Sequence, residues 1–274
     1  MEDLSRRRFL SSGGRTAVAI FGASLPLISV STLALLSRPL PRIDDSISDV
    51  AHRAAEIAIS EWQAWGGQYV DGADTSTPIR QAVGAVASAV ETDPGYRQRV
   101  LIYLKVGVYP DTDEWRLYVD TPWSASFISY CMRMAGAGDR FSYAIGHHSY
   151  VSDAVRNAVT QKRENLLVAY PSSDMAPQVG DFLWRGRKSS ASPNTASWGM
   201  DRIIKHLKDG WEGFPSHCDL VVSVALKAGR IHAIGGNLAD RVLRLQLRID
   251  DKGLLEDDHY RVVVRNNIGK FASR

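Results

Sequence analysis

The stretch PWSASFISYCMRMAG, residues 122–136, decides the fold class that we expect for this chain. Its apolar side chains recur every three or four residues, as they do on one face of an amphipathic helix, and Gly136 supplies a stop. The positions on that face are Ser124, Phe127, Ile128, Cys131, Met134 and Ala135. The spacing predicts a helix with Ser124 in its first turn and on its packed side.

Further helices and a set of strands are expected around this helix. Helical spacing predicts helices over 47–65, 96–105 and 200–207. The stretches 68–78 and 185–197, rich in polar residues, are expected to be loops. Short apolar or alternating runs predict strands at 166–170, 181–184, 218–226, 230–235, 243–249 and 260–265. Because helices come first and hairpin-linked strands follow, we expect an α+β fold with an antiparallel sheet.

The N-terminal segment has the pattern of an export signal. SRRRFL at 5–10 fits the twin-arginine motif, and an uncharged stretch follows at 16–36. Twenty-one uncharged residues are also about long enough to cross a bilayer, so a single membrane anchor is the alternative. Cleavage is left open, because the small-x-small candidate at 29–31 is weak. In either case, we expect the rest of the chain to lie outside the cytoplasm, in the periplasm or another extracytoplasmic space.

The charge is divided unevenly between this leader and the rest of the chain. Six of the 33 Lys and Arg and two of the 30 Asp and Glu precede Ile43, which leaves 27 against 28 in the remainder. A near-neutral body does not suit a nucleic-acid partner, which needs clustered cations on the folded domain. We expect a leader or anchor at 1–42, a helical extension at 43–115 and the main domain at 116–274.

Ser124 is a candidate nucleophile. The free N–H groups at a helix N-terminus favour negative charge, which suits a nucleophile and a nearby oxyanion. An N-cap serine without chemical function is the alternative, and spacing alone favours it. Neither cysteine can take this role easily, because Cys131 lies two helical turns deeper and Cys218 points away from its neighbour His217. Two cysteines also exclude a disulfide-built scaffold and a C-x-x-C site.

His217 and Asn237 form a candidate pair of base and orienter. If residue 226 faces residue 230 across the turn, Asn237 stands opposite Asp219, and His217 is its diagonal neighbour. Diagonal neighbours lie about 7–8 Å apart, close enough for the amide to orient the imidazole. A histidine that ends a strand and an asparagine in a Gly-Gly-Asn turn are an equally good interpretation.

These segments together resemble the NlpC-type, papain-like peptidase superfamily, and within it the CHAP amidases. The resemblance rests on PWSASFI at 122–128, HCDLVV at 217–222, GGN at 235–237 with RV at 241–242, and PQVGDF at 177–182. Segments around 61–62, 99–103 and 147–150 resemble an uncharacterised bacterial family of this superfamily that has serine in the nucleophile slot. The resemblance covers about residues 47–268. It implies a papain-like core, in which a nucleophile helix packs on the sheet behind extra N-terminal helices.

The resemblance implies a catalytic set of Ser124, His217 and Asn237, with one departure. The superfamily has cysteine where this chain has Ser124, and a hydroxyl is far less ionised than a thiol at neutral pH. His217 must then remove the proton during attack, as in a Ser-His-Asp hydrolase. A pseudoenzyme that kept the groove without the chemistry is the alternative.

Other side chains are candidates for substrate binding. Trp123, His147, Tyr150 and Arg185 are expected near the groove, although core packing is the more common role of tryptophan and a solvated loop is typical of arginine. We apply the same expectation of core packing to the tryptophans at 184, 198 and 211. Adjacent histidines such as those at 147–148 rarely bind one metal together, so we expect neither metal nor cofactor.

We therefore expect an exported hydrolase that cleaves amide bonds of cell-wall peptidoglycan or a similar peptide substrate. A non-catalytic module that binds the wall or a protein partner is one alternative. An esterase or acyl-transfer enzyme is the other.

Overall fold

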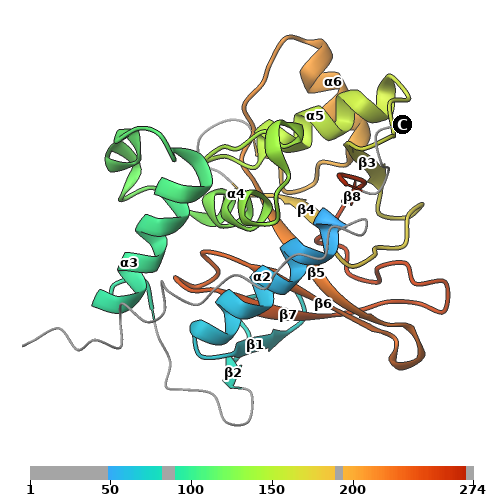
Figure 1. The fold of residues 1–274 in the computed structure, drawn as a ribbon. Coiled ribbons are helices and arrows are strands. Elements are labelled where there is room, and N and C mark those ends of the chain that lie inside the picture. Colours follow the sequence, from blue (N-terminus) through green and yellow to red (C-terminus); the bar gives the residue numbers. More distant parts are fainter. Residues whose placement is uncertain (1–48, 82–89, 189–193, 270–274) are drawn as a thin grey trace, which may run out of the picture. The chain divides into compact units, whose positions relative to one another are not determined.

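A computed structural model of the chain describes residues 49–81, 90–188 and 194–269 (Figure 1). The export-signal prediction at 1–42 lies outside these residues. The described residues all belong to one compact unit. Within the described ranges, no helix combines the length and the apolar character needed to cross a bilayer.

Five α-helices and four shorter helical turns are present in the described part of the chain. The α-helices are α2 (Val50–Ala64), α3 (Pro94–Ile102), α4 (Ser124–Met134), α5 (His148–Val159) and α6 (Met200–Lys208). The shorter turns are the π-helix η1 (Tyr103–Val108) and the 3₁₀ turns η2 (Glu114–Tyr118), η3 (Gly138–Arg140) and η4 (Leu226–Ala228). The predicted helices are confirmed within a few residues, whereas α5 was not predicted.

The strands form one mixed sheet of eight strands in the order β2-β1-β7-β6-β5-β4-β8-β3. They are β1 (Gln68–Asp71), β2 (Arg80–Gln81), β3 (Leu167–Pro171), β4 (Phe182–Gly186), β5 (Ser216–Ala225), β6 (Arg230–Gly235), β7 (Leu243–Arg248) and β8 (Val262–Asn266). The α+β class is confirmed, but the expectation of a purely antiparallel sheet is wrong. β1 pairs in parallel with β7, and it lies in the stretch 68–78 that we expected to be a loop.

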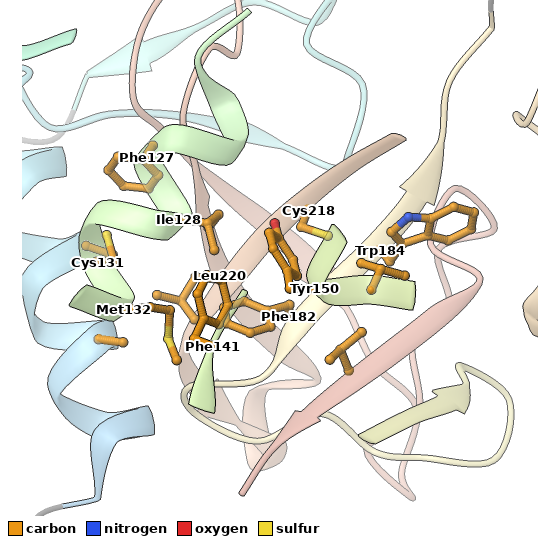
Figure 2. Packing of buried hydrophobic residues seen from close by; sticks show 14 of the residues in the cluster. Phe127, Ile128, Cys131, Met132, Phe141, Tyr150, Phe182, Trp184, Cys218 and Leu220 are labelled. Carbon is orange, nitrogen blue, oxygen red and sulfur yellow. The ribbon is translucent and has the colours of Figure 1, made fainter. Parts of the chain in front are cut away.

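Helices α2, α4 and α5 cover one face of this sheet (Figure 1). Their buried side chains share a core with alternate residues of β5, because successive side chains of a strand point to opposite faces. Figure 2 shows this core around Phe127, Tyr150, Phe182, Cys218 and Leu220. The core fixes the start of α4 and the start of α5 against the same part of the sheet.

The face of α4 is largely as predicted. The chain buries Ser124, Phe127 and Ile128 there, but Met134 is 38% exposed. Met132 is buried in its place, because α4 is packed on two sides. On one of these sides η1 comes so close at Gly107 that an added Cβ would stand 2.7 Å from the backbone nitrogen of Tyr130.

The expectation that tryptophans pack in the core holds for all but one of those considered. Trp123, Trp184 and Trp198 are buried. Trp211 is 66% exposed, because it follows Gly210 at the end of α6 and lies outside the core.

The opposite face of the sheet carries a second core. Val221 and Leu183 lie in this second core together with Tyr260, whereas Cys218 and Leu220 belong to the helix-covered face. The side chains of β5 thus enter two different cores. Near its start, β5 also carries the buried polar side chains of His217 and Asp219.

Candidate active site

Ser124 is the first residue of α4, and its hydroxyl contacts a histidine. The N-cap position is taken by Trp123, which makes no side-chain capping bond. Ser124 is 3% exposed, and its Oγ lies 2.7 Å from Nε2 of His147. The hydroxyl is therefore engaged with an imidazole, and the interpretation of Ser124 as an N-cap serine does not hold.

His147 directly precedes α5 and connects Ser124 to Tyr150. Its Nδ1 hydrogen-bonds the Tyr150 hydroxyl, and both rings are buried. Burial lowers the pKa of His147 well below its ordinary value, and the nearby His217 and Arg187 act in the same direction. His147 is consequently neutral at pH 7, as a proton acceptor must be.

The two contacts of His147 are compatible with one neutral tautomer that suits catalysis. When Nδ1 carries the proton, it donates to the Tyr150 oxygen, and Nε2 accepts the hydrogen bond from the Ser124 hydroxyl.

His217 belongs to a second network, which contains a carboxylate. Its Nε2 donates to Oδ1 of Asp219 at 2.9 Å, and the Tyr260 hydroxyl donates to Oδ2 at 2.5 Å. His217, Asp219 and Tyr260 are all buried. Burial acts to raise the pKa of Asp219, but its interactions with His217, and also with Arg185 and Tyr260, hold that pKa below the ordinary value.

The expected contact between Asn237 and His217 is a wrong prediction. Asn237 lies beyond the end of β6 in a left-handed conformation, with φ of 54°, and lines a different pocket together with Trp123. The position beside His217 belongs to Asp219. The side chain of Asp219 lies against Gly235, where an added Cβ would meet Oδ1 at 1.9 Å.

Asn237 does not reach His217 because β6 ends at Gly235, so Asn237 is no longer part of the strand that pairs with β5. The register of the hairpin also differs from the assumed one. Ala225, not residue 226, faces Arg230, and a bulge between Val221 and Ser223 shifts the pairs again, so that Leu220 faces Ile234. The connection includes the 3₁₀ turn η4 and Gly229 at φ of 60°. An extra residue in a strand interrupts its alternation, but the run 218–226 is almost continuously apolar and has no alternation to interrupt, so the bulge could not be predicted from it.

The two networks meet where the rings of His147 and His217 touch. The ring centroids are 5.2 Å apart. Burial lowers the pKa of His217, although Asp219 opposes this shift. Nδ1 of His217 is buried and has no hydrogen-bond partner among the residues that the structure describes.

A small pocket gives access to Ser124. It has a volume of about 180 Å³ and is lined by Ser124, His147, Arg187, Phe214 and Ser216, among others. The first N–H groups of an α-helix have no partner within the helix, so those at the start of α4 are available beside the Ser124 hydroxyl. A bound carbonyl group would find there a nucleophile, a proton acceptor and hydrogen-bond donors.

The remaining predicted binding residues have different surroundings. Trp123 is buried and stacks on Trp65, with ring centroids 5.4 Å apart, which leaves no free ring face for a sugar on that side. Arg185 pairs across the sheet with His217. Its guanidinium donates to the Ala73 carbonyl at 3.0 Å and lies half-buried beside a wider pocket.

Metal ligands and reactive thiols are not part of this arrangement. In the ranges 49–81, 90–188 and 194–269, no three His, Cys, Asp or Glu side chains are grouped as metal ligands would be. Both Cys131 and Cys218 are buried, and burial raises the pKa of each thiol.

Comparison with known proteins identifies a family without an assigned activity. The model of the family described as "Uncharacterized protein conserved in bacteria (DUF2272)" matches residues 56–267. No curated protein and no solved structure matches the chain. The matched range includes Ser124, His147, His217 and Asp219 and covers well over half of the sequence. The chain belongs to the DUF2272 family of bacterial proteins.

Proposed function

We propose that this protein is a serine hydrolase that cleaves amide bonds of cell-wall peptidoglycan. The observation that carries the proposal is the 2.7 Å contact between Oγ of Ser124 and Nε2 of a neutral, buried His147. A hydroxyl becomes an effective nucleophile when an adjacent base removes its proton during attack.

The reaction proceeds through a covalent intermediate. Oγ of Ser124 attacks the carbonyl carbon of the amide while its proton passes to Nε2 of His147. The N–H groups at the start of α4 stabilise the oxyanion. The amine leaves with the proton from His147, and an acyl-serine remains. Water, deprotonated by His147, then attacks the acyl group; the product leaves as a carboxylic acid, and His147 returns its proton to Oγ of Ser124.

His217 and Asp219 support His147 in this scheme. The ring of His217 packs against His147, and Asp219 fixes the orientation of that ring through a buried hydrogen bond. We assign proton transfer to His147 instead of His217 because His147 has the hydrogen bond to Ser124. A histidine held by a carboxylate is the common choice of base in serine hydrolases, so variants at both positions are compared below.

The choice of peptidoglycan as substrate rests on the sequence. The twin-arginine pattern at 5–10 supports export, with the catalytic residues in the periplasm or attached to the membrane through residues 16–36. The resemblance to NlpC-type and CHAP amidases points to peptide-type amides of the wall. The buried Ser–His pair supports acyl transfer, which those bonds require.

The proposal is tested by incubating the full chain with purified peptidoglycan and identifying new termini by mass spectrometry. We expect cleavage that is lost in Ser124→Ala, and labelling of Ser124 by a fluorophosphonate probe. Absence of both cleavage and labelling would favour the non-catalytic binding module. Labelling together with turnover of ester substrates only would favour the esterase alternative, and cleavage that survives Ser124→Ala would overturn the assigned nucleophile.

A further inference from the structure

A second, wider pocket adjoins the one at Ser124 and is strongly basic. Its volume is about 470 Å³. The residues that line it are Arg185, Gly186, Arg187, Lys188, Ala196, Asp258, His259 and Arg261. Four permanent cations thus face a single carboxylate of the lining, in a domain whose overall charge is close to zero.

The two pockets share Arg187. It lines both the Ser124 pocket and the basic pocket, so a group bound in the basic pocket lies next to a residue that also borders Ser124. The backbone of Arg187 is fixed, since its N–H donates to Oγ1 of the buried Thr195 at 2.9 Å and its carbonyl accepts from the Thr195 N–H at 3.1 Å. Gly186 permits this close approach, because an added Cβ would stand 1.8 Å from the Thr195 carbonyl oxygen.

Three of the four cations of the basic pocket make no ion pair with described residues, whereas Arg185 interacts with the carboxylates of Asp219 and Asp257. Neither Arg187, Lys188 nor Arg261 forms an ion pair with any residue in the described ranges. Burial and the charge of Arg185 lower the pKa of Arg187, although Asp219 opposes this shift, so the two arginines repel each other. An anionic ligand would relieve this repulsion and gain charge-assisted hydrogen bonds.

We propose that the basic pocket binds a carboxylate of the substrate, beside the amide bond that Ser124 attacks. This inference rests on the proposed function and specifies its substrate class: acidic peptides with a free carboxylate within a few bonds of the scissile amide. The shared Arg187 places the carboxylate next to the reacting carbonyl. Arg261 and Lys188 extend the positive surface away from it.

The experiment measures binding, so it does not depend on turnover. Full-length Ser124→Ala protein is titrated calorimetrically with two forms of one tetrapeptide from the wall stem, one with free carboxylates and one with every carboxylate amidated. We expect the free form to bind about tenfold more tightly, as one charge-assisted contact would produce. The double variant Arg187→Gln, Arg261→Gln should remove this preference. Lys205→Gln, an exposed cation of α6 outside both pockets, should retain it.

Several outcomes would overturn the inference. Equal affinity for the two peptides, no binding of either, or a preference that persists in the double variant would each contradict a carboxylate site. Inorganic phosphate is titrated in parallel; if it binds and the free peptide does not, the pocket takes phosphate groups. Failure of the proposed function looks different, because peptidoglycan then stays intact or is cut without Ser124, whatever the peptides bind.

Discussion

The two histidines at the candidate site lie in contact but differ in their partners. His147 hydrogen-bonds two neutral hydroxyls, those of Ser124 and Tyr150. His217 hydrogen-bonds the carboxylate of Asp219, which Tyr260 also contacts. Hydrogen bonds to a buried charge are stronger than those between neutral groups. We infer that the His217 network stabilises the site, whereas the His147 network is weak enough to exchange its proton during catalysis.

The largest effect is expected for removal of the proton acceptor. His147→Ala should lower the rate of peptidoglycan cleavage by about 10²–10⁴-fold, the usual contribution of a general base. The measurement is the initial rate of new amine termini, with circular dichroism to confirm folding. His52→Ala, an exposed histidine of α2, serves as the control. A folded His217→Ala protein that lost more activity than His147→Ala would make His217 the base and reverse the comparison.

Asp219→Ala should mainly affect stability. It leaves the donors of His217 and Tyr260 buried without an acceptor, at about 1–3 kcal/mol for each, so unfolding should become easier by about 2–6 kcal/mol. Urea unfolding measures this loss. Asp257→Ala, which removes the partner of the exposed His259, should cost less than about 1 kcal/mol. Equal losses in the two variants would show that the buried network is not stabilising.

Replacing one tyrosine of each network with phenylalanine tests the two networks by the same chemical change. Tyr260→Phe removes a hydrogen bond to a carboxylate and should cost about 1.5–3 kcal/mol, whereas Tyr150→Phe removes one between neutral groups and should cost about 0.5–1.5 kcal/mol. Both hydroxyls are buried, so exposure does not complicate the comparison. Urea midpoints at one pH measure both, and the reverse order would contradict the inferred division of roles.

The smallest expected effect is the difference between His147 and His217 in how stability depends on pH. Burial lowers the pKa of both histidines, so below about pH 6.5 the unfolded chain binds protons that the folded protein does not. Stability is therefore complete above about pH 6.5 and falls as the pH drops toward each folded-state pKa, by at most about 1.4 kcal/mol per pH unit for each ring. His147 should contribute over a wider range, because Asp219 opposes the shift of His217 alone.

Thermal unfolding of the wild type between pH 5 and pH 7 measures this slope. His147→Gln should flatten it more than His217→Gln does. A stability that is constant over this range in the wild type would mean that neither ring is held neutral by burial.

Much of the fold could be predicted because its longer elements have clear periodicity. The spacing of Phe127, Ile128 and Cys131 identified α4, and the alternation over 243–249 identified β7. β1 was missed because four residues are too few for a pattern to stand out, and its pairing with β7 depends on tertiary contacts. α5 was missed although Val151, Ala154 and Val155 have helical spacing and are buried.

At the site, the sequence identified the residues better than their contacts. Ser124, His147 and His217 were all candidates, but His147 was expected to bind substrate, since nothing in the sequence placed the start of α5 against the start of α4. Asp219 was overlooked although it stands two residues from His217, on the same face of the strand. An acidic residue at that spacing was the available signal, but β6 was assumed to continue as far as Asn237, whereas it ends at Gly235.

The parallel pairing of β1 with β7 has a consequence for the order of events during synthesis. Tyr69 pairs with Arg244, so β1 leaves the ribosome long before its partner exists. At 5–20 residues per second, this delay is roughly 10–35 s. During that time β1 can pair with β2, but its other edge, which later pairs with β7, has no native strand. A chaperone or a neighbouring nascent chain can occupy that edge. The newly made protein is therefore most exposed to mispairing until residue 248 has been released.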